Sequence, residues 1–295
     1  MTILQIKIIR LYRYLLSTHR WSLMYKGIND NKFVDIKQPK SLSRADSFVI
    51  EFSGKIYIFF EEWVNGEKAH LSVGELNTDT NELINIHKIL NKEYHLSYPF
   101  VFKHKDEWYL IPETHKNNSI DLYKFSLFPH KTEKVKTLVS DIDAADTTLT
   151  IKDGVVYLFT NMRGDTGYHN SNLSLFYSDD LLSSDFKEHP INPIETDSRY
   201  ARMAGGILQE NEALYRIAQD CSINYGGCMH KFEIVELTKR TYREKIMETL
   251  HPPKKCIATH TFSKSDKFIV IDVIYKTRSV VQILKNMYNL LTRIF

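Results

Sequence analysis

Short runs of apolar and aromatic residues recur along this chain, and each is followed about eleven positions later by a second such run. Four copies of this pair align, and their first residues are Asp46, Tyr98, Asp146 and Ala204, at intervals of 52, 48 and 58 residues. A looser fifth copy begins at His260. Further strand-like segments lie between the copies, such as residues 70–76 and 173–178, and there aromatic and β-branched residues alternate with polar ones, as in a half-buried strand. The pattern therefore predicts five antiparallel strand pairs.

The length of the repeat predicts the architecture. A period near fifty residues is too long for paired-helix repeats and is typical of the blades of a β-propeller. Turn residues such as Ser53-Gly54 and Asp153-Gly154 separate the paired runs. Because a single small sheet cannot bury both of its faces, the blades must pack on one another around an axis. We expect an all-β, five-bladed β-propeller over residues 41–275.

The two ends of the chain have the apolar periodicity of short amphipathic helices. Residues 1–40 are predicted to form a helix and a lead-in, and residues 276–295 a second helix. The apolar stripes are Leu4, Ile8, Leu11 and Leu15 at one end, and Val280, Ile283, Met287, Leu291 and Ile294 at the other. Amphipathic helices usually pack on protein, so both helices are expected to close the propeller with these stripes. Attachment to a membrane surface is the alternative.

Charge separates the ends from the body. Residues 1–26 contain five Lys or Arg and residues 276–295 contain four, with no acidic residue in either segment. Since the net charge of the chain is +3, the middle carries 3 − 9 = −6. Basic helices on an acidic body favour peripheral contact with an anionic membrane surface. They do not favour nucleic acid, because the body has no basic stripe with interleaved aromatic residues.

Cysteine usage and the N-terminal segment indicate the cellular compartment in which the protein lies. Three basic residues interrupt the first apolar run, so it does not read as a secretory signal, and it is too short to span a bilayer. The cysteines are Cys221, Cys228 and Cys256. They fit neither a disulfide framework nor a zinc-binding spacing. We expect a cytoplasmic protein, in the alternative one attached to the inner face of the membrane, with no metal or cofactor.

The first residues of the repeats are the main candidates for chemistry. In a propeller the first strand of each blade lines the axis, so these side chains converge on one pocket. The pocket is expected to hold Asp46, Tyr98, Asp146, Arg202 and His260. Two carboxylates in an aromatic cavity suit acid and base chemistry at the anomeric carbon of a sugar. The alternative is that both aspartates only cap backbone amides of neighbouring blades.

A second set of polar residues ends the second strand of the repeats. These residues are Glu61, Glu62, Glu113, Asn161, Gln219 and Asp220. They are either solvated strand ends and hydrogen-bond partners between blades, or groups that face the pocket. In the second case Glu62, Glu113 or Asp220 holds the hydroxyl groups of a sugar or serves as the acid, and Glu62 is the catalytic candidate.

Two arginines form the candidate anion-binding segment. Arg199 and Arg202 stand beside the flexible pair Gly205-Gly206. Guanidinium groups hold phosphate or carboxylate through paired hydrogen bonds, so a sugar phosphate is a candidate ligand. The alternative is that Arg202 neutralises Asp46 or Asp146 inside the protein.

Five segments together resemble a known family. They are residues 45–52, 95–102, 143–149, 202–205 and 218–221, with 59–63 and 111–114 completing the first two. They resemble the propeller domain at the N-terminus of plant glucosamine inositolphosphorylceramide transferases, and more distantly the five-bladed clan that includes arabinanases and fructosidases. The resemblance implies that Asp46 is the base or nucleophile and that Asp146 tunes its pKa.

One departure from that clan bears on the reaction. The clan's acid is usually a Glu that opens blade four, where this chain has Arg202-Met-Ala-Gly. A leaving sugar alcohol needs a proton donor, whereas a leaving phosphate needs stabilisation of its charge. The resemblance implies an enzyme of surface polysaccharide or glycolipid synthesis, and this departure favours transfer of a sugar from a phosphate-activated donor. A glycoside hydrolase or phosphorylase stays open, as does a non-catalytic glycan-binding propeller that assists a partner glycosyltransferase.

Overall fold

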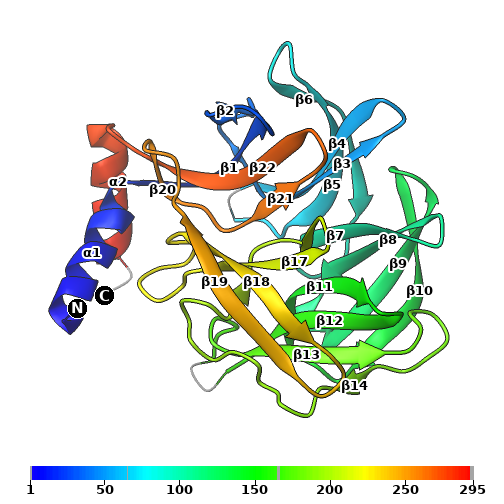
Figure 1. Ribbon diagram of the computed structural model, residues 1–295. Helices are drawn as coiled ribbons and strands as arrows, with labels where there is room; N and C mark the ends of the chain where they lie inside the picture. The colour runs from blue at the N-terminus through cyan, green and yellow to red at the C-terminus, as the bar shows by residue number, and fades with distance from the viewer. Residues whose placement is uncertain (1, 65, 165–166, 293–295) are drawn as a thin grey trace.

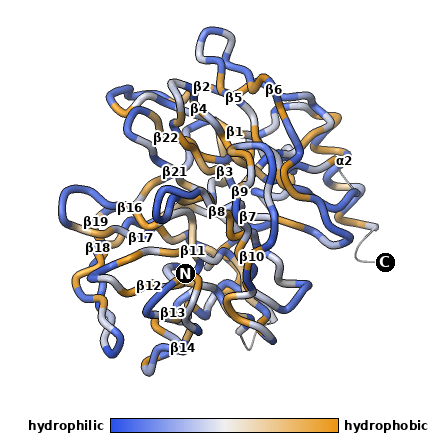
Figure 2. The backbone as a smooth tube through the Cα atoms, turned by 90° about the vertical axis from the view of Figure 1, so that its right-hand side faces the viewer, coloured by the Kyte–Doolittle hydropathy of each residue, from blue (hydrophilic) through white to orange (hydrophobic). Residues whose placement is uncertain are grey.

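The structure is a computed structural model that describes residues 2–64, 66–164 and 167–292. Within these residues, five antiparallel sheets surround one axis (Figure 1). The predicted all-β, five-bladed propeller with a short helix at each end is confirmed. Figure 2 shows that hydrophobic segments follow the strands, while many of the connecting loops are hydrophilic.

Each of the first four blades is a local meander of consecutive strands. Blade one contains β3 (Leu42–Phe52), β4 (Lys55–Val64), β5 (His70–Asn77) and β6 (Glu82–Leu90). Blade two contains β7 (Ser97–His104), β8 (Glu107–Glu113), β9 (Ser119–Leu127) and β10 (Lys131–Ser140), with a short 3-10 turn at His115–Asn117. Blade three contains β11 (Ala144–Lys152), β12 (Val155–Met162), β13 (Leu173–Ser178) and β14 (Lys187–Glu188). Blade four contains β15 (Arg202–Met203), β16 (Leu208–Glu210), β17 (Ala213–Gln219), β18 (Met229–Leu237) and β19 (Tyr242–Leu250).

Blade five joins the two ends of the chain. It combines β20 (Cys256–Ala258), β21 (Phe262–Lys264) and β22 (Phe268–Lys276) with β1 (Ser17–Gly27) and β2 (Val34–Asp35). β1 pairs antiparallel with β22, from Ser17 opposite Lys276 to Gly27 opposite Phe268. Residues 17–27, which the sequence analysis placed in the lead-in, therefore form a strand of the propeller. No local hairpin signal marks this pairing, because its partner strand lies at the far end of the chain.

The apolar core lies between the blades. Its largest cluster joins blades one, two and three and includes the fully buried Phe59, Leu110 and Leu158. Aromatic rings pack edge to face across the blade boundary, as Phe48 does against Tyr98 at 5.0 Å. Aromatic side chains bury large areas, and such pairs add roughly 0.5–1.5 kcal/mol beyond area burial. This packing holds the first strands close to the axis.

Two helices lie side by side outside blade five (Figure 1). They are α1 (Ile3–Leu15), begun by a capping box at Thr2, and α2 (Val280–Leu291), capped by Ser279. The buried side chain of Asn286 fixes α2 to the C-terminal end of α1 and to the start of β1, since its amide donates to the backbone oxygens of residues 14, 15 and 17. No helix in the described part of the chain is both long and apolar enough to cross a membrane.

Most residues of the two apolar stripes face solvent, while Leu15 and Ile283 are half-buried. Leu4, Ile8 and Leu284 expose 67%, 57% and 58% of their surface, and no residue of α1 is buried. The other large exposed side chains of the pair are Ile3, Leu11, Tyr12, Val280, Val281, Met287, Tyr288 and Leu291. The expected closure of the propeller by these stripes is thus absent among the described residues, and Ile294 lies outside them. Polar anchors such as Asn286 connect the pair to the body instead.

Candidate active site

The first strands of blades one to three share a backbone irregularity near the axis. Asp46, Tyr98 and Asp146 have φ of 51°, 48° and 50°. Each lies in a shift of the strand register, between residues 45 and 48, 97 and 100, and 145 and 148. Left-handed backbone is unfavourable for residues other than glycine, and bulges of this kind redirect a side chain. The first position of the repeat is therefore a bulge at the axis.

Side-chain oxygens satisfy the backbone N–H groups of these bulges. Asp46 N–H donates to Asp272 Oδ2 at 2.9 Å, and Tyr98 N–H donates to Asp46 Oδ2 at 3.1 Å. Asp146 N–H donates to Glu113 Oε2 at 3.2 Å. Buried N–H groups are costly to leave unpaired. Asp46 thus caps a backbone N–H group of the neighbouring blade, and this contact does not exclude a catalytic role for Asp46.

A cavity of about 290 Å³ opens beside these bulges. Within the described chain, its carboxyl groups are those of Asp46, Glu61, Glu113 and Asp146. Its aromatic residues are Trp21, Trp63 and Tyr225, and its basic residues are His95, Arg202 and His260. A larger groove of about 410 Å³ lies between blades four and five, and it contains none of these residues. Converging acids and aromatic walls make the axial cavity the candidate site.

A buried imidazole stands between two carboxylates at the edge of this cavity. His260 Nε2 lies 2.9 Å from Asp46 Oδ1, and His260 Nδ1 lies 2.9 Å from Asp272 Oδ2. Burial lowers the pKa of His260, but the two carboxylates outweigh it and raise that pKa to about 10. Burial likewise raises the pKa of Asp46, but His260 and the Thr261 hydroxyl bring it down to about 2. Asp46 is therefore an ionised carboxylate paired with an imidazolium.

This pairing predicts a pH dependence of stability. The pKa of folded His260, about 10, lies above its ordinary 6.5, so its contribution is complete below pH 6.5 and is lost as pH rises through 10. The pKa of folded Asp46, about 2, lies below 3.8, so its contribution is complete above pH 3.8 and is lost towards pH 2. We expect urea denaturation to show the free energy of unfolding falling by up to about 1.4 kcal/mol per pH unit above pH 6.5. H260Q should flatten this slope, and equal slopes in both proteins would contradict the pairing.

Glu61 has the opposite character to Asp46. Its Oε1 lies 2.8 Å from His95 Nε2, and it is buried at the end of β4. Burial, followed by the nearby charge of Asp46, raises the pKa of Glu61 well above its ordinary value. Adjacent carboxyl groups whose pKa values are pushed apart are the arrangement that separates an acid from a base. Of these two carboxyl groups, Glu61 is thus the one that holds its proton to higher pH.

Asp146 and Arg202 form the second charged pair of the cavity. Arg202 Nε donates to Asp146 Oδ2 at 2.7 Å, and its Nη1 donates to Asn170 Oδ1 at 3.1 Å. Burial raises the pKa of Asp146, and the guanidinium opposes this rise. The ring of Tyr225 stands 5.1 Å from the guanidinium carbon. Arg202 therefore pairs with Asp146 inside the protein, as the alternative in the sequence analysis expected.

Tyr98 and Glu62, which the sequence analysis proposed for the site, make structural contacts instead. Tyr98 is buried, and its hydroxyl donates to Gly205 O and bonds to Thr148 Oγ1, each at 2.8 Å, which fixes strands across the axis. Glu62 lies outside the set that lines the cavity, paired with Arg44 at 2.6 Å. Successive side chains of a strand point to opposite faces, so Glu61 enters the cavity and Glu62 does not.

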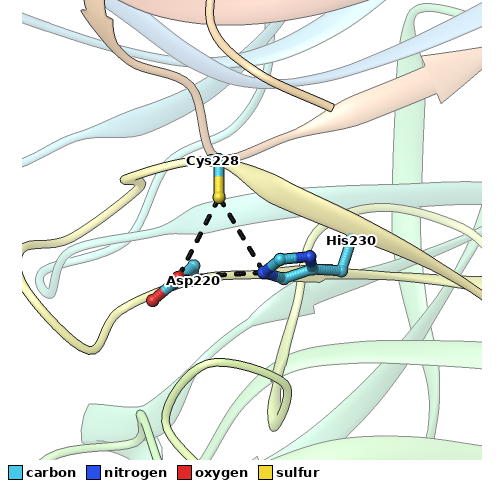
Figure 3. A group of neighbouring side chains, drawn as sticks. All are labelled: Asp220, Cys228 and His230. Carbon is cyan, nitrogen blue, oxygen red and sulfur yellow. Dashed lines mark hydrogen bonds and ion pairs between the residues drawn. The ribbon is translucent and has the colours of Figure 1, made fainter. Parts of the chain in front are cut away.

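Arg199 and Asp220 also lie outside the axial cavity. Arg199 is exposed and bonds to Asp197, two residues away. Asp220 stands in a separate group with Cys228 and His230 (Figure 3). The cavity residues that the sequence did not single out are Trp21, Trp63, His95 and Tyr225. Trp21 comes from β1, so it could be found only by knowing which strand closes the ring.

The fold is a five-bladed propeller similar to those of solved glycoside hydrolases. The catalytic domain of the GH62 α-L-arabinofuranosidase of Coprinopsis cinerea matches with a TM-score of 0.58 and 10% identity, over 88% of this chain and 98% of that one. The Bacillus subtilis arabinanase matches with a TM-score of 0.53 and 12% identity, over 78% and 93%. At such identities the likeness shows the fold alone.

The chain belongs to the family described as glucosamine inositolphosphorylceramide transferase 1, N-terminal, whose model matches residues 27–273. The transferase 1 of Oryza sativa subsp. japonica is 33% identical over 206 residues, which cover 68% of this chain and 27% of the plant protein. The Arabidopsis thaliana protein of the same name is 32% identical over 211 residues, covering 68% and 26%. The chain thus matches about a quarter of the length of these relatives. The family resemblance seen in the sequence is confirmed.

Proposed function

We propose that the axial cavity binds a sugar and carries out acid and base chemistry at its anomeric carbon. The observation that carries this proposal is the pair of adjacent carboxyl groups, Glu61 and Asp46, whose pKa values are shifted in opposite directions. Glu61 is the proton donor, and the ionised Asp46 is the base or nucleophile. The flat rings of Trp21 and Trp63 offer apolar surface to a sugar ring.

The reaction in this proposal is the transfer of a sugar during synthesis of a surface polysaccharide or glycolipid. The plant relatives are named as transferases, which supports transfer. Arg202 is the cationic group of the cavity that would meet a phosphate-activated donor, sharing its guanidinium between the phosphate and Asp146. Glu113, 4.0 Å from Arg202 and beside Asp146, would hold substrate hydroxyl groups.

A second candidate function is glycan binding without chemistry, in support of a partner glycosyltransferase. Two observations favour it. The family match corresponds to the N-terminal part of plant proteins that extend well beyond it. In addition, Asp46 already accepts bonds from Tyr98 N–H, Thr261 and His260, which limits its freedom as a nucleophile.

A substrate panel separates these functions. The full chain would be incubated with aryl glycosides, oligosaccharides, sugar phosphates and nucleotide sugars, with and without glycan or lipid acceptors. Product attached to an acceptor is the expected result, and free sugar formed without one would assign hydrolysis. Saturable glycan binding with no product from any donor would assign the binding function. Neither binding nor product would overturn both.

We further propose that α1 and α2 dock the protein on an anionic membrane surface, such as the inner face of the cytoplasmic membrane. The exposed apolar side chains of α1 and α2 lie together on one helix pair, and contiguous exposed apolar surface marks sites of protein or membrane contact. The apolar stripes are accompanied by Lys7, Arg10 and Lys285, all exposed, and the two helices contain no acidic residue. Interfacial helices bind through buried apolar area together with attraction to anionic lipids.

Vesicle sedimentation tests this docking surface. The triple variant L4E/I8E/L284E is expected to bind phosphatidylserine vesicles at least about tenfold more weakly than the natural chain, because burial of each apolar side chain is lost. V235E, at an exposed apolar position of blade four, is the matched control and should bind normally. Equal binding of all three proteins would contradict the proposal. Deletion of residues 1–20 is unsuitable as a test, because it removes part of β1.

A further inference from the structure

Three metal-ligating side chains converge outside the axial cavity, at the base of a loop in blade four (Figure 3). Asp220 directly follows β17, while Cys228 and His230 stand at the start of β18. Cys228 Sγ lies 3.9 Å from Asp220 Oδ2 and 3.8 Å from His230 Nε2. The third side, from Asp220 Oδ2 to His230 Nε2, is 3.7 Å. The three atoms thus form a nearly equilateral triangle.

The size of this triangle matches a zinc ion. A point equidistant from three atoms that are mutually about 3.8 Å apart lies roughly 2.2 Å from each, and Zn²⁺ binds sulfur, nitrogen and oxygen ligands at about 2.0–2.3 Å. Thiolate and imidazole together select zinc among common divalent cations, with carboxylate as an accepted third ligand. We propose that Asp220, Cys228 and His230 form a Zn²⁺ site.

Further hydrogen bonds orient two of the ligands. Asp220 Oδ1 accepts from the backbone N–H of Ser222 at 2.8 Å and from its hydroxyl at 2.6 Å, which leaves Oδ2 for the centre of the triangle. His230 Nδ1 bonds to Thr249 Oγ1 at 3.0 Å, which leaves Nε2 for the centre. Metal-binding carboxylates and imidazoles are ordinarily held in this way by groups behind them.

The geometry does not fit a nucleophilic relay. In a Cys-His-Asp relay the acid bonds to one imidazole nitrogen and the thiol to the other. Here both Cys228 Sγ and Asp220 Oδ2 face Nε2, at 3.8 Å and 3.7 Å, and the second separation is long for a hydrogen bond between nitrogen and oxygen. His260, in contrast, contacts a different carboxylate with each of its nitrogens at 2.9 Å, so that group is an ion-paired triad.

The surroundings leave room for a metal and for its charge. Asp220 and Cys228 are only partly buried, which provides an entry path and a fourth ligand position for water. One carboxylate and one thiolate balance the charge of a divalent ion. Metals bind cysteine as the thiolate, so binding would release the thiol proton to solvent.

The site would fasten the loop that carries Tyr225 into the axial cavity. Asp220 and Cys228 lie at the two ends of residues 221–227, so one ion would join both ends. Tyr225 stands 5.1 Å from the Arg202 guanidinium and 5.0 Å from the His260 ring. From outside, Arg13 of α1 bonds to Asn224 on the same loop. The metal is thus a positioning element for one wall of the cavity, and it takes no part in the proposed sugar chemistry.

Cobalt substitution tests the site directly. Protein stripped with a chelator would be titrated with Co²⁺, with the expectation of one equivalent bound and a thiolate-to-cobalt charge-transfer band that Zn²⁺ displaces. C228S should lose this band, whereas C256S, the matched control at a buried cysteine of blade five, should keep it. D220N and H230Q should each bind the metal at least about tenfold more weakly.

Thermal unfolding provides the second measurement. Zn²⁺ should raise the Tm of the natural chain and of C256S, but not that of C228S, because only a folded site binds the metal. The Tm of each variant without metal shows whether it folds. A charge-transfer band that persists in C228S would overturn the proposal, and so would the absence of both a band and a Tm shift at saturating metal. Either result assigns the three side chains to a hydrogen-bonded cluster only.

Discussion

E61Q is expected to lower turnover by about 10²–10⁴-fold, the usual contribution of a positioned acid or base. Glutamine has nearly the same shape and keeps a bond to His95, but it has no proton to deliver to a leaving oxygen. Because burial and Asp46 raise the pKa of Glu61, the active, protonated form persists to higher pH than for an ordinary Glu and is lost as pH rises through that pKa. The measurement is turnover of the best substrate from the panel, as a function of pH.

E62Q is the matched control for this variant. Glu62 is the next residue on β4, but it pairs with Arg44 and His70 outside the cavity. E62Q should keep turnover within a few-fold of the natural chain, and E61Q should keep its Tm. Full activity of E61Q would exclude Glu61 as the acid. Loss of activity in E62Q alone would restore the assignment that the sequence favoured.

H260A is expected to lower the free energy of unfolding by about 3–5 kcal/mol, as does removal of one partner from other buried ion pairs. The change would leave Asp46 and Asp272 buried with no cation between them. Asp272 also accepts backbone N–H groups from blades one and five, so the two blades would lose a shared centre. Urea denaturation at pH 6 measures the effect.

Two further variants make the stability experiment specific. H251A, at an exposed histidine before blade five, should change the free energy of unfolding by less than about 0.5 kcal/mol. D46N should restore part of what H260A loses when the two are combined, because it removes one of the two unpaired charges. If H260A lowered the free energy of unfolding by less than about 1 kcal/mol, the imidazolium would not be essential to the stability of the propeller.

The blades could be predicted from sequence because each of the first four consists of strands that follow one another along the chain. Residue 46 and residue 57 belong to one hairpin, so alternation and turn residues report the pairing directly. The closing strand β1 could not be found in this way, because its partner β22 lies about 250 residues further along the chain. Trp21 was missed for the same reason.

Other parts of the site depend on details finer than a pattern. Glu61 and Glu62 are adjacent and chemically identical in sequence, and only the strand register sends one into the cavity. Arg202 and Arg199 were equally plausible anion ligands, yet Arg202 is partly buried against Asp146 and Arg199 bonds to its neighbour Asp197. The group of Asp220, Cys228 and His230 depends on how a loop folds back, and no fixed spacing of these residues in the sequence predicts it.

The pairing of β1 with β22 has a consequence for biosynthesis. At ordinary translation rates of about 5–20 residues per second, roughly 10–50 s separate the emergence of these two strands from the ribosome. During that time β1 has no partner at one edge, which is the condition under which strands recruit other chains. The axial cavity matures last, since Trp21 arrives first and His260 nearly last. A nascent chain stalled before residue 256 would hold four blades, a strand β1 with no partner at one edge, and no finished site.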